Sequence, residues 1–186
     1  MSQIKVTRCD IEGICVIEPV VHKDARGYFM ETYSQRDMAE AGLDVTFVQD
    51  NQSMSTKGVL RGLHFQIEHP QGKLVRVVQG TIFDVAVDVR VGSPTYGHWY
   101  GVELSEENNK QFYIGEGFAH GFLVLSDVAR VCYKVTDFWR PKEEVGILWN
   151  DPDIAIEWPL EIGQQPIISD RDKNYKTFKS LNRYRR

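Results

Sequence analysis

Cysteine is scarce in this sequence. There are three in 186 residues, Cys9, Cys15 and Cys132, and no Cys-x-x-Cys pair. An odd, scattered set of this kind predicts no disulfide framework. The N-terminus "MSQIKVTRCDIEG" lacks the apolar core of a signal peptide, and no apolar run is long enough to span a bilayer. These absences predict a soluble protein of the cytoplasm with no membrane partner.

Basic charge is also in short supply. The chain has 22 lysines and arginines against 26 aspartates and glutamates, which gives a net charge of -4. A nucleic-acid binder gains much of its affinity from basic residues that neutralise phosphates, so this composition predicts no nucleic-acid partner. The sequence shows no internal repeat, low-complexity stretch or linker. We therefore expect residues 1–186 to form a single domain.

The strongest pattern along the chain has a period of two. In "TIFDVAVDVRV" the side chains of Phe83, Val85, Val87 and Val89 share one face, which predicts a strand with one apolar wall. Other segments of strand composition follow at short intervals, separated by Gly, Pro, Asn and Asp: "ICVIEPVV", "YFMETY", "VTFVQD", "VLRGLHFQ", "KLVRVVQ", "HWYGVEL", "GFLVLS" and "RVCYKVTDF". Many short strands at this spacing are typical of a sandwich or barrel.

Helical signals are few. The segment "SQRDMAEAG" predicts a helix in which Ser34 is the N-cap and Gly42 marks the C-terminal end. The expected fold class is therefore all-β with a few short helices.

Residues 58–80, "GVLRGLHFQIEHPQGKLVRVVQG", have the spacing of a metal-binding β-barrel motif without its ligands. Gln66 stands where a second ligand would be, and Lys73 replaces the acidic ligand. An ammonium group repels a metal ion, so we expect no bound metal. His69 precedes Pro70 in what we expect to be a hairpin loop.

His64 and Lys73 favour proton chemistry. Period-two alternation puts Leu60, His64 and Gln66 on one face of a strand, so His64 can face a barrel interior. A histidine there can take a proton from a carbon next to a carbonyl while a nearby cation stabilises the enolate. The alternative is a hydrogen-bonded core histidine with no chemical role.

An enzyme that inverts a stereocentre also needs an acid on the opposite face of the carbon. In "RVCYKVTDF", Tyr133 shares a face with Val131 and Val135 and should point to the interior, where its hydroxyl can supply that proton. A core tyrosine with a locally satisfied hydroxyl explains the same pattern. Both interpretations stay open on these residues alone.

Seven motifs give the sequence a specific resemblance when they are taken together and in order: "RGLHFQ", "QGKLVRVVQG", "FDVAVDVR", "SPTYGHWYGVELS", "EGFAHGF", "YKVTDFW" and "GILWNDPDIAIEWP". Over about Ile14 to Asp172 the chain resembles the dTDP-4-dehydrorhamnose 3,5-epimerase family. The resemblance implies an antiparallel jelly-roll (cupin-like) barrel, usually a homodimer, that works without a metal or other cofactor. It also implies the substrate, dTDP-4-dehydro-6-deoxy-D-glucose, which the family inverts at C3 and C5 to give dTDP-4-dehydro-L-rhamnose for L-rhamnose synthesis.

The resemblance also assigns catalytic roles. The family's base falls on His64, its aspartate partner on Asp172, the lysine near the enolate on Lys73 and the proton donor on Tyr133. The match around Asp172 is looser, so Asp170 and Asp84 are rivals for the role of partner.

Substrate-binding positions are implied in the same way. They are Arg26, Glu31, Gln49, Asp50, Asn51, Arg61, Lys73, His120, Glu144 and Arg171. Because family dimers exchange an N-terminal segment, Arg26 and Glu31 are expected to serve the site of the partner subunit. Arginines suit a pyrophosphate through paired hydrogen bonds.

The sequence departs from the family in three places. Gly115 replaces a proline, Arg171 replaces a lysine, and Phe138 and Trp139 stand where tyrosines are frequent. Pocket aromatics can influence how many centres are inverted, so a single-centre epimerase of another dTDP-4-keto-6-deoxysugar is one alternative. A non-catalytic sugar-nucleotide-binding barrel and a metal-dependent cupin oxygenase or isomerase are the others. Gln66 and Lys73 argue against the metal-dependent alternative.

Overall fold

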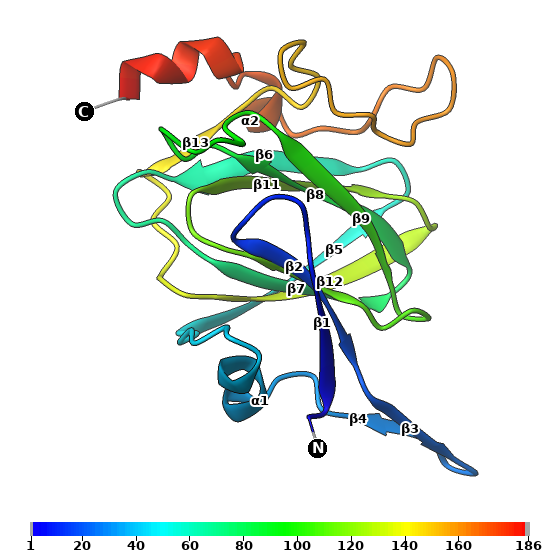
Figure 1. Ribbon diagram of the computed structural model, residues 1–186. Helices are drawn as coiled ribbons and strands as arrows, with labels where there is room; N and C mark the ends of the chain where they lie inside the picture. Colours follow the sequence, from blue (N-terminus) through cyan, green and yellow to red (C-terminus); the bar gives the residue numbers. More distant parts are fainter. Residues whose placement is uncertain (1, 185–186) are drawn as a thin grey trace.

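Two antiparallel β-sheets stacked face to face make up most of the molecule (Figure 1). The computed structural model describes residues 2–184. The strands are β1 (Ile4–Arg8), β2 (Ile14–Pro19), β3 (Val21–Asp24), β4 (Gly27–Met30), β5 (Gln49–Thr56), β6 (Leu60–Gln66), β7 (Lys73–Gln79), β8 (Thr81–Asp88), β9 (Trp99–Ser105), β10 (Gln111–Ile114), β11 (Phe118–Val124), β12 (Val128–Val135) and β13 (Glu144–Gly146). The helical elements are α1 (Gln35–Glu40), α2 (Asp170–Lys173) and the 3-10 helix η1 (Phe178–Tyr184).

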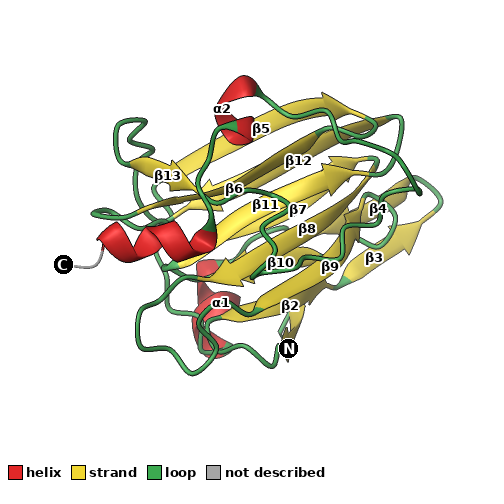
Figure 2. Ribbon diagram, turned by 90° about the horizontal axis from the view of Figure 1, so that it is seen from above, coloured by secondary structure: helices red, strands yellow, loops and turns green. Residues whose placement is uncertain are grey.

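The larger sheet has the strand order β1-β2-β10-β7-β12-β5, and the smaller has the order β13-β6-β11-β8-β9. Neighbouring strands pair antiparallel throughout both sheets. Figure 2 looks down on the sheets from above and shows their strands running roughly alongside one another. The expected all-β, antiparallel fold is confirmed. A jelly roll fits this arrangement, although the two sheets keep separate hydrogen-bonded ladders and do not close into one barrel.

A hydrophobic core fills the space between the sheets. Strand β8 contributes Ile82 and Ala86 to it, and both are fully buried. The opposite face of β8 is buried too, because Val85 and Val87 pack against residues of the C-terminal segment such as Leu181. In Figure 1 this segment, coloured orange to red, lies over the smaller sheet. The strand expected to have one apolar wall is therefore covered on both sides.

The expected helix is confirmed as α1. The Ser34 side chain accepts a hydrogen bond from the backbone N–H of Asp37, which makes it the N-cap. Gly42 follows the helix with a φ of +78°, a conformation that suits glycine at a helix end. The strand expected over residues 45–50 begins only at Gln49. The preceding Val45 and Phe47 are partly buried and pack against the core cluster that includes Met38 of α1.

The connection between β6 and β7 corrects another expectation. His69 and Pro70 do not lie in a hairpin loop, because β6 belongs to the smaller sheet and β7 to the larger one. The segment crosses between the sheets, and His69 Nδ1 lies 2.7 Å from a Glu143 carboxylate oxygen.

Strands β3 and β4 form a two-stranded hairpin that projects from the sheets (Figure 1). We call residues 21–30 the arm. Its aromatic side chains Tyr28 and Phe29 are 60% and 67% exposed. Among the described residues, no helix is both long and apolar enough to cross a membrane.

Candidate active site

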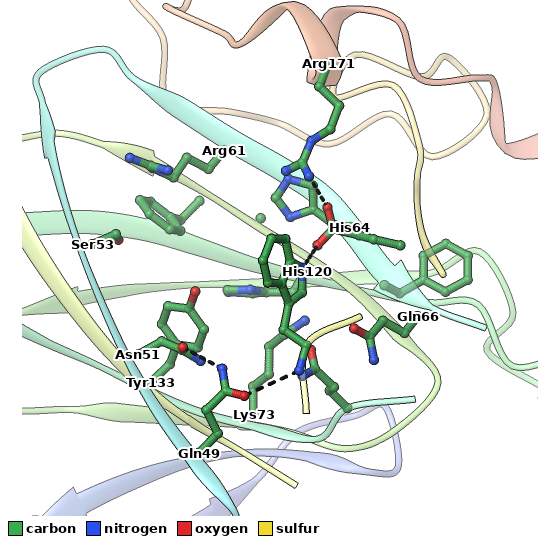
Figure 3. Close-up of a pocket in the computed structure, with 16 residues that line it drawn as sticks. Gln49, Asn51, Ser53, Arg61, His64, Gln66, Lys73, His120, Tyr133 and Arg171 are labelled. Carbon is green, nitrogen blue, oxygen red and sulfur yellow. Dashed lines mark hydrogen bonds and ion pairs between the residues drawn. The ribbon is translucent and has the colours of Figure 1, made fainter. Parts of the chain in front are cut away.

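A pocket of about 290 Å³ opens between the two sheets, next to the core (Figure 3). Both sheets contribute to its wall: β5, β7 and β12 from the larger one, and β6, β11 and β13 from the smaller one. The lining residues are Gln49, Asn51, Ser53, Arg61, His64, Phe65, Gln66, Gln71, Lys73, His120, Gly121, Phe122, Tyr133, Trp139, Glu144 and Arg171. Four of the chemically active side chains expected from the sequence analysis therefore meet here: His64, Lys73, His120 and Tyr133.

His64 stands on β6 with its ring half-buried against an aspartate. Its Nε2 lies 3.4 Å from Asp172 Oδ2. The carboxylate also accepts a hydrogen bond from the backbone N–H of Gly62, at 3.2 Å. Asp172 belongs to the short helix α2, whose N-cap Ser169 accepts from the Asp172 N–H. The C-terminal segment thus brings Asp172 across the smaller sheet to His64.

The pKa of Asp172 is lowered from 3.8 to about 2. Burial raises this pKa, but the hydrogen bond and charge of His64, together with the Gly62 N–H and Ser169, outweigh burial. The carboxylate is therefore ionised at neutral pH. Its contact with His64 Nε2 holds the imidazole in one orientation.

The two rival aspartates have other partners. Asp170 is 98% exposed and pairs with Lys173. Asp84, fully buried on β8, lies 2.7 Å from Nε2 of His120. Of the three candidates, Asp172 is the one that the structure places against His64.

His120 and Asp84 form a second histidine–aspartate pair beside the first. The register of β11 against β6 puts His120 directly opposite His64. Burial lowers the pKa of His120, and the adjacent Asp84 opposes that effect without cancelling it. A neutral His120 suits hydrogen bonding to a ligand.

Lys73 is the first residue of β7 and points into the pocket (Figure 3). It is 9% exposed, and none of the carboxylates in the described part of the chain forms an ion pair with it. Burial lowers the pKa of its ammonium group from 10.5 to about 8, against the opposing charges of Glu144 and Asp84. Lys73 remains mainly charged at neutral pH, and its charge is available to a ligand.

Tyr133 enters the pocket from β12, in the sheet opposite His64. As expected, it shares a face with Val131 and Val135, which are both buried, and it packs against the core. Burial raises the pKa of its phenol, while the charge of Arg61 works in the other direction. The hydroxyl therefore stays protonated over the neutral range.

Polar groups fill the rest of the pocket. Arg61 Nε donates to Ser55 Oγ at 3.0 Å, and Gln49 donates to Asn51 at 2.8 Å. On the opposite side, Arg171 forms ion pairs with Glu144 and Asp172. All the expected binding residues except three line this pocket.

The three exceptions are Arg26, Glu31 and Asp50. Arg26 lies at the tip of the arm with its side chain 90% exposed, and it pairs with Asp24. Glu31 directly follows the arm and is also absent from the pocket wall. Asp50 alternates with Gln49 and Asn51 along β5, so its side chain lies on the other face of the sheet, where it pairs with Lys134.

Sequence reasoning missed Ser53, whose buried hydroxyl has no hydrogen-bond partner within the described chain. The signal was present, since Gln49, Asn51 and Ser53 repeat a polar residue at every second position of β5. Gln71 was missed as well; its amide donates to the Asp137 carbonyl at the pocket rim.

Metal ligands do not gather in this site. Within residues 2–184, no group of three or more His, Cys, Asp or Glu side chains has the arrangement needed to hold a metal ion. A pocket between two sheets with a histidine, an unpaired cation and a phenol is typical of enzymes that move protons at a carbon next to a carbonyl. Epimerases are the isomerases that use such transfers to invert a stereocentre.

Comparison with known proteins gives the family. Residues 8–180 match the family model described as dTDP-4-dehydrorhamnose 3,5-epimerase. The enzyme of that name from Methanothermobacter thermautotrophicus is 57% identical over 176 residues, covering 95% of each chain. The chain belongs to the dTDP-4-dehydrorhamnose 3,5-epimerase family, whose members are isomerases.

Solved structures agree with this assignment. A crystal structure of dTDP-6-deoxy-D-glucose-3,5-epimerase from Legionella pneumophila, in complex with dTDP-4-keto-L-rhamnose, superposes with a TM-score of 0.93. It is 47% identical and covers 97% of this chain and 96% of its own. A 3'-monoepimerase from Streptomyces bikiniensis, in complex with dTDP-quinovose, has a TM-score of 0.88 at 37% identity, with 95% and 89% coverage.

Proposed function

We propose that this protein inverts C3 and C5 of dTDP-4-dehydro-6-deoxy-D-glucose to give dTDP-4-dehydro-L-rhamnose. One observation carries the proposal: His64 and Tyr133 reach the same pocket from opposite sheets, and Lys73, which has no carboxylate partner among the described residues, lines that pocket too. A base and an acid on opposite sides of a carbon are what inversion requires. The substrate follows from the names of the relatives.

His64 is the proposed base. When its Nε2–H donates to Asp172, the lone pair of the imidazole lies on Nδ1. Nδ1 takes the proton from C5 or C3, and the electron pair of the broken C–H bond moves toward the C4 carbonyl to form an enolate. Asp172 then stabilises the imidazolium through the same contact.

Lys73 and Tyr133 complete the proposed reaction. The Lys73 ammonium stabilises the enolate oxygen by charge and hydrogen bonding in a site with little water. The Tyr133 hydroxyl gives its proton to the opposite face of the same carbon, which re-forms the ketone. The imidazolium then loses its proton to solvent and the tyrosinate regains one, so the enzyme is ready for the second centre.

The binding residues fit a nucleotide sugar. Arg61 at the edge of the pocket suits the pyrophosphate, and Gln49 and Asn51 offer amides on the same side. His120 and Glu144 line the sugar end, and Arg171 holds Glu144 in place. Each step of the proposed reaction uses side chains of the pocket alone.

We also propose a homodimer in which the arm of each subunit completes the partner's site. The arm projects from its own sheets and exposes two aromatic rings, and Arg26 at its tip lies outside its own pocket (Figure 1). Exposed aromatics beside an arginine are typical of interface surfaces. The family resemblance supports the exchange.

The chain is proposed to work as one domain in the reducing cytoplasm. The C-terminal segment supports the single domain because it supplies Asp172 to the pocket and Leu181 to the core. Cys9, Cys15 and Cys132 are all free thiols, which suits a reducing compartment.

The test is incubation of the purified, chelator-treated protein with dTDP-4-dehydro-6-deoxy-D-glucose in D2O, followed by NMR. Deuterium at both C3 and C5 with inverted configuration is the expected result. No exchange at either carbon would refute the catalytic proposal and favour a sugar-nucleotide-binding barrel. Loss of exchange on chelation, restored by added metal, would show that a metal takes part.

A single-centre epimerase is the second candidate. Trp139 lines the pocket at a position where the family often has a tyrosine, and the fold also matches a 3'-monoepimerase. The same experiment separates the two, because a monoepimerase inverts only one of the two carbons. A non-catalytic barrel is disfavoured, since a binding protein has no need for a base, a cation and an acid together.

A further inference from the structure

Gln66 is buried at the end of β6, and its amide is fully used within the protein. The side chain is 4% exposed. Its Nε2 donates to the carbonyls of His69, at 2.7 Å, and Phe138, at 3.3 Å. Its Oε1 accepts from the backbone N–H of Arg140 at 2.6 Å. One amide thus ties together the sheet crossover and the segment that leads into β13.

Two of these contacts flank Trp139 in the chain. Gln66 holds the carbonyl of the residue before Trp139 and the N–H of the residue after it. The backbone of Trp139 is fixed from two directions by one buried side chain. Figure 3 shows Gln66 on the wall of the pocket.

Trp139 itself is held by hydrogen bonds more than by burial. Its side chain lines the pocket, yet the residue is 52% exposed. Its backbone N–H donates to Gln49 Oε1 at 3.4 Å, and its indole N–H donates to Glu144 Oε2 at 2.9 Å. Trp139 therefore links two expected binding residues, Gln49 through its backbone and Glu144 through its indole. A half-exposed ring depends strongly on the backbone that carries it.

We propose that Gln66 is a positioning residue for substrate binding, because its amide holds residues 138–140 so that the Trp139 indole stands over the pocket. The proposal rests on the proposed function for its substrate and adds a residue that touches no reacting atom. This role also explains why residue 66 is an amide and not a metal ligand. Both donors and the acceptor of Gln66 are used in hydrogen bonds to backbone groups.

A double-mutant cycle tests this role. Gln66→Met keeps the size of the side chain and removes all three hydrogen bonds. We expect KM for the dTDP-sugar to rise about tenfold, the scale of one lost aromatic contact, while kcat changes less than about twofold. In a Trp139→Ala background, Gln66→Met should have little further effect on kcat/KM, because the ring that Gln66 positions is already gone.

The matched control is Asn108→Leu. Asn108 also makes three hydrogen bonds to backbone groups, with Ser105, Lys110 and Glu103, but in the turn between β9 and β10 and outside the pocket. This variant should lose stability and keep KM. If Gln66→Met does not fold, Gln66→Glu takes its place, since it keeps the acceptor for Arg140 and loses both donors.

An unchanged kcat/KM in the Gln66 variant would overturn the proposal. So would an equal loss in the Trp139→Ala background, which would show that Gln66 acts by another route. A second readout needs no substrate: acrylamide quenching of Trp139 fluorescence, obtained as the difference between each protein and its Trp139→Phe counterpart. Quenching should increase in the Gln66 variant, and this result is independent of whether the proposed reaction is correct.

Discussion

Lys73 should be essential for activity and unfavourable for stability. Its ammonium group is buried, and among the described residues it has no carboxylate partner. Burial lowers its pKa from 10.5 to about 8, against the charges of Glu144 and Asp84. A lowering of this size means that the folded protein disfavours the charged lysine by roughly 3 kcal/mol. We expect Lys73→Met to abolish epimerisation and to raise the free energy of unfolding at pH 7 by up to ~3 kcal/mol.

The pH dependence has opposite signs for stability and activity. Between pH 8 and 10.5 the unfolded chain binds the Lys73 proton more tightly than the folded protein, so this lysine's contribution to stability improves as pH rises. Activity should fall over the same range. With a pKa of about 8, roughly nine-tenths of the free enzyme carries the charge at pH 7 and about one-tenth at pH 9, so kcat/KM should fall about tenfold.

Urea unfolding at pH 7 and 9.5 measures the first effect, and NMR-detected deuterium incorporation measures the second. Lys57→Met, which removes an exposed lysine at the turn between β5 and β6, is the matched control and should change neither. A Lys73→Met protein less stable than the wild type at pH 7 would show that the folded state accommodates the charge well. Retained epimerisation would remove Lys73 from enolate stabilisation.

Three further predictions follow from the site. Asp172→Asn should lower kcat by about 10²- to 10⁴-fold with little change in KM, because His64 loses the group that orients it; steady-state kinetics checks this. Tyr133→Phe should keep some exchange of C3 and C5 protons with D2O while blocking inversion, and exchange coupled to full inversion would remove Tyr133 as the acid. Mixing inactive His64→Ala subunits with Arg26→Ala subunits should restore activity if the arm serves the partner, since one site of the mixed dimer is then intact. No recovery in verified mixed dimers would place Arg26 outside the partner's site.

The sequence predicted the parts of the site that lie on regular strands. His64 lies on β6 and Tyr133 on β12, and the period of two in these strands was enough to predict that both side chains point inward. The same rule missed most of β5, because its inward side chains are the polar Gln49, Asn51 and Ser53. A strand that faces a polar pocket has no apolar face to reveal it.

The burial of charged residues was the second feature that the sequence did not predict. Asp84 and Asp88 alternate with valines along β8, a pattern typical of a solvent-facing side, yet both are fully buried. Asp84 pairs with His120 from the neighbouring strand. Asp88 accepts from Arg90, Ser93 and Thr95, which follow it closely in the chain and fold back onto its carboxylate. The position of Asp172 came only from the family resemblance, since no local period links it to His64 over 108 residues.

Each carboxylate around the pocket has a partner other than Lys73, which leaves the lysine charge open for an anion. Asp172 lies against His64, Asp84 against His120, and Glu144 against Arg171. Among the described lining residues, Lys73 is the buried cation that forms no ion pair with a carboxylate.

A ketone brings no full negative charge to Lys73, whereas the enolate formed from it does. The buried ammonium is therefore less well compensated in the free protein than in the intermediate. Interactions that strengthen between the ground state and the intermediate lower the barrier, whereas equal stabilisation of both does not. Because Lys73 has no carboxylate partner in the described part of the chain, its charge destabilises the folded protein and at the same time stabilises the enolate. For this reason the stability and activity of Lys73→Met should change in opposite directions.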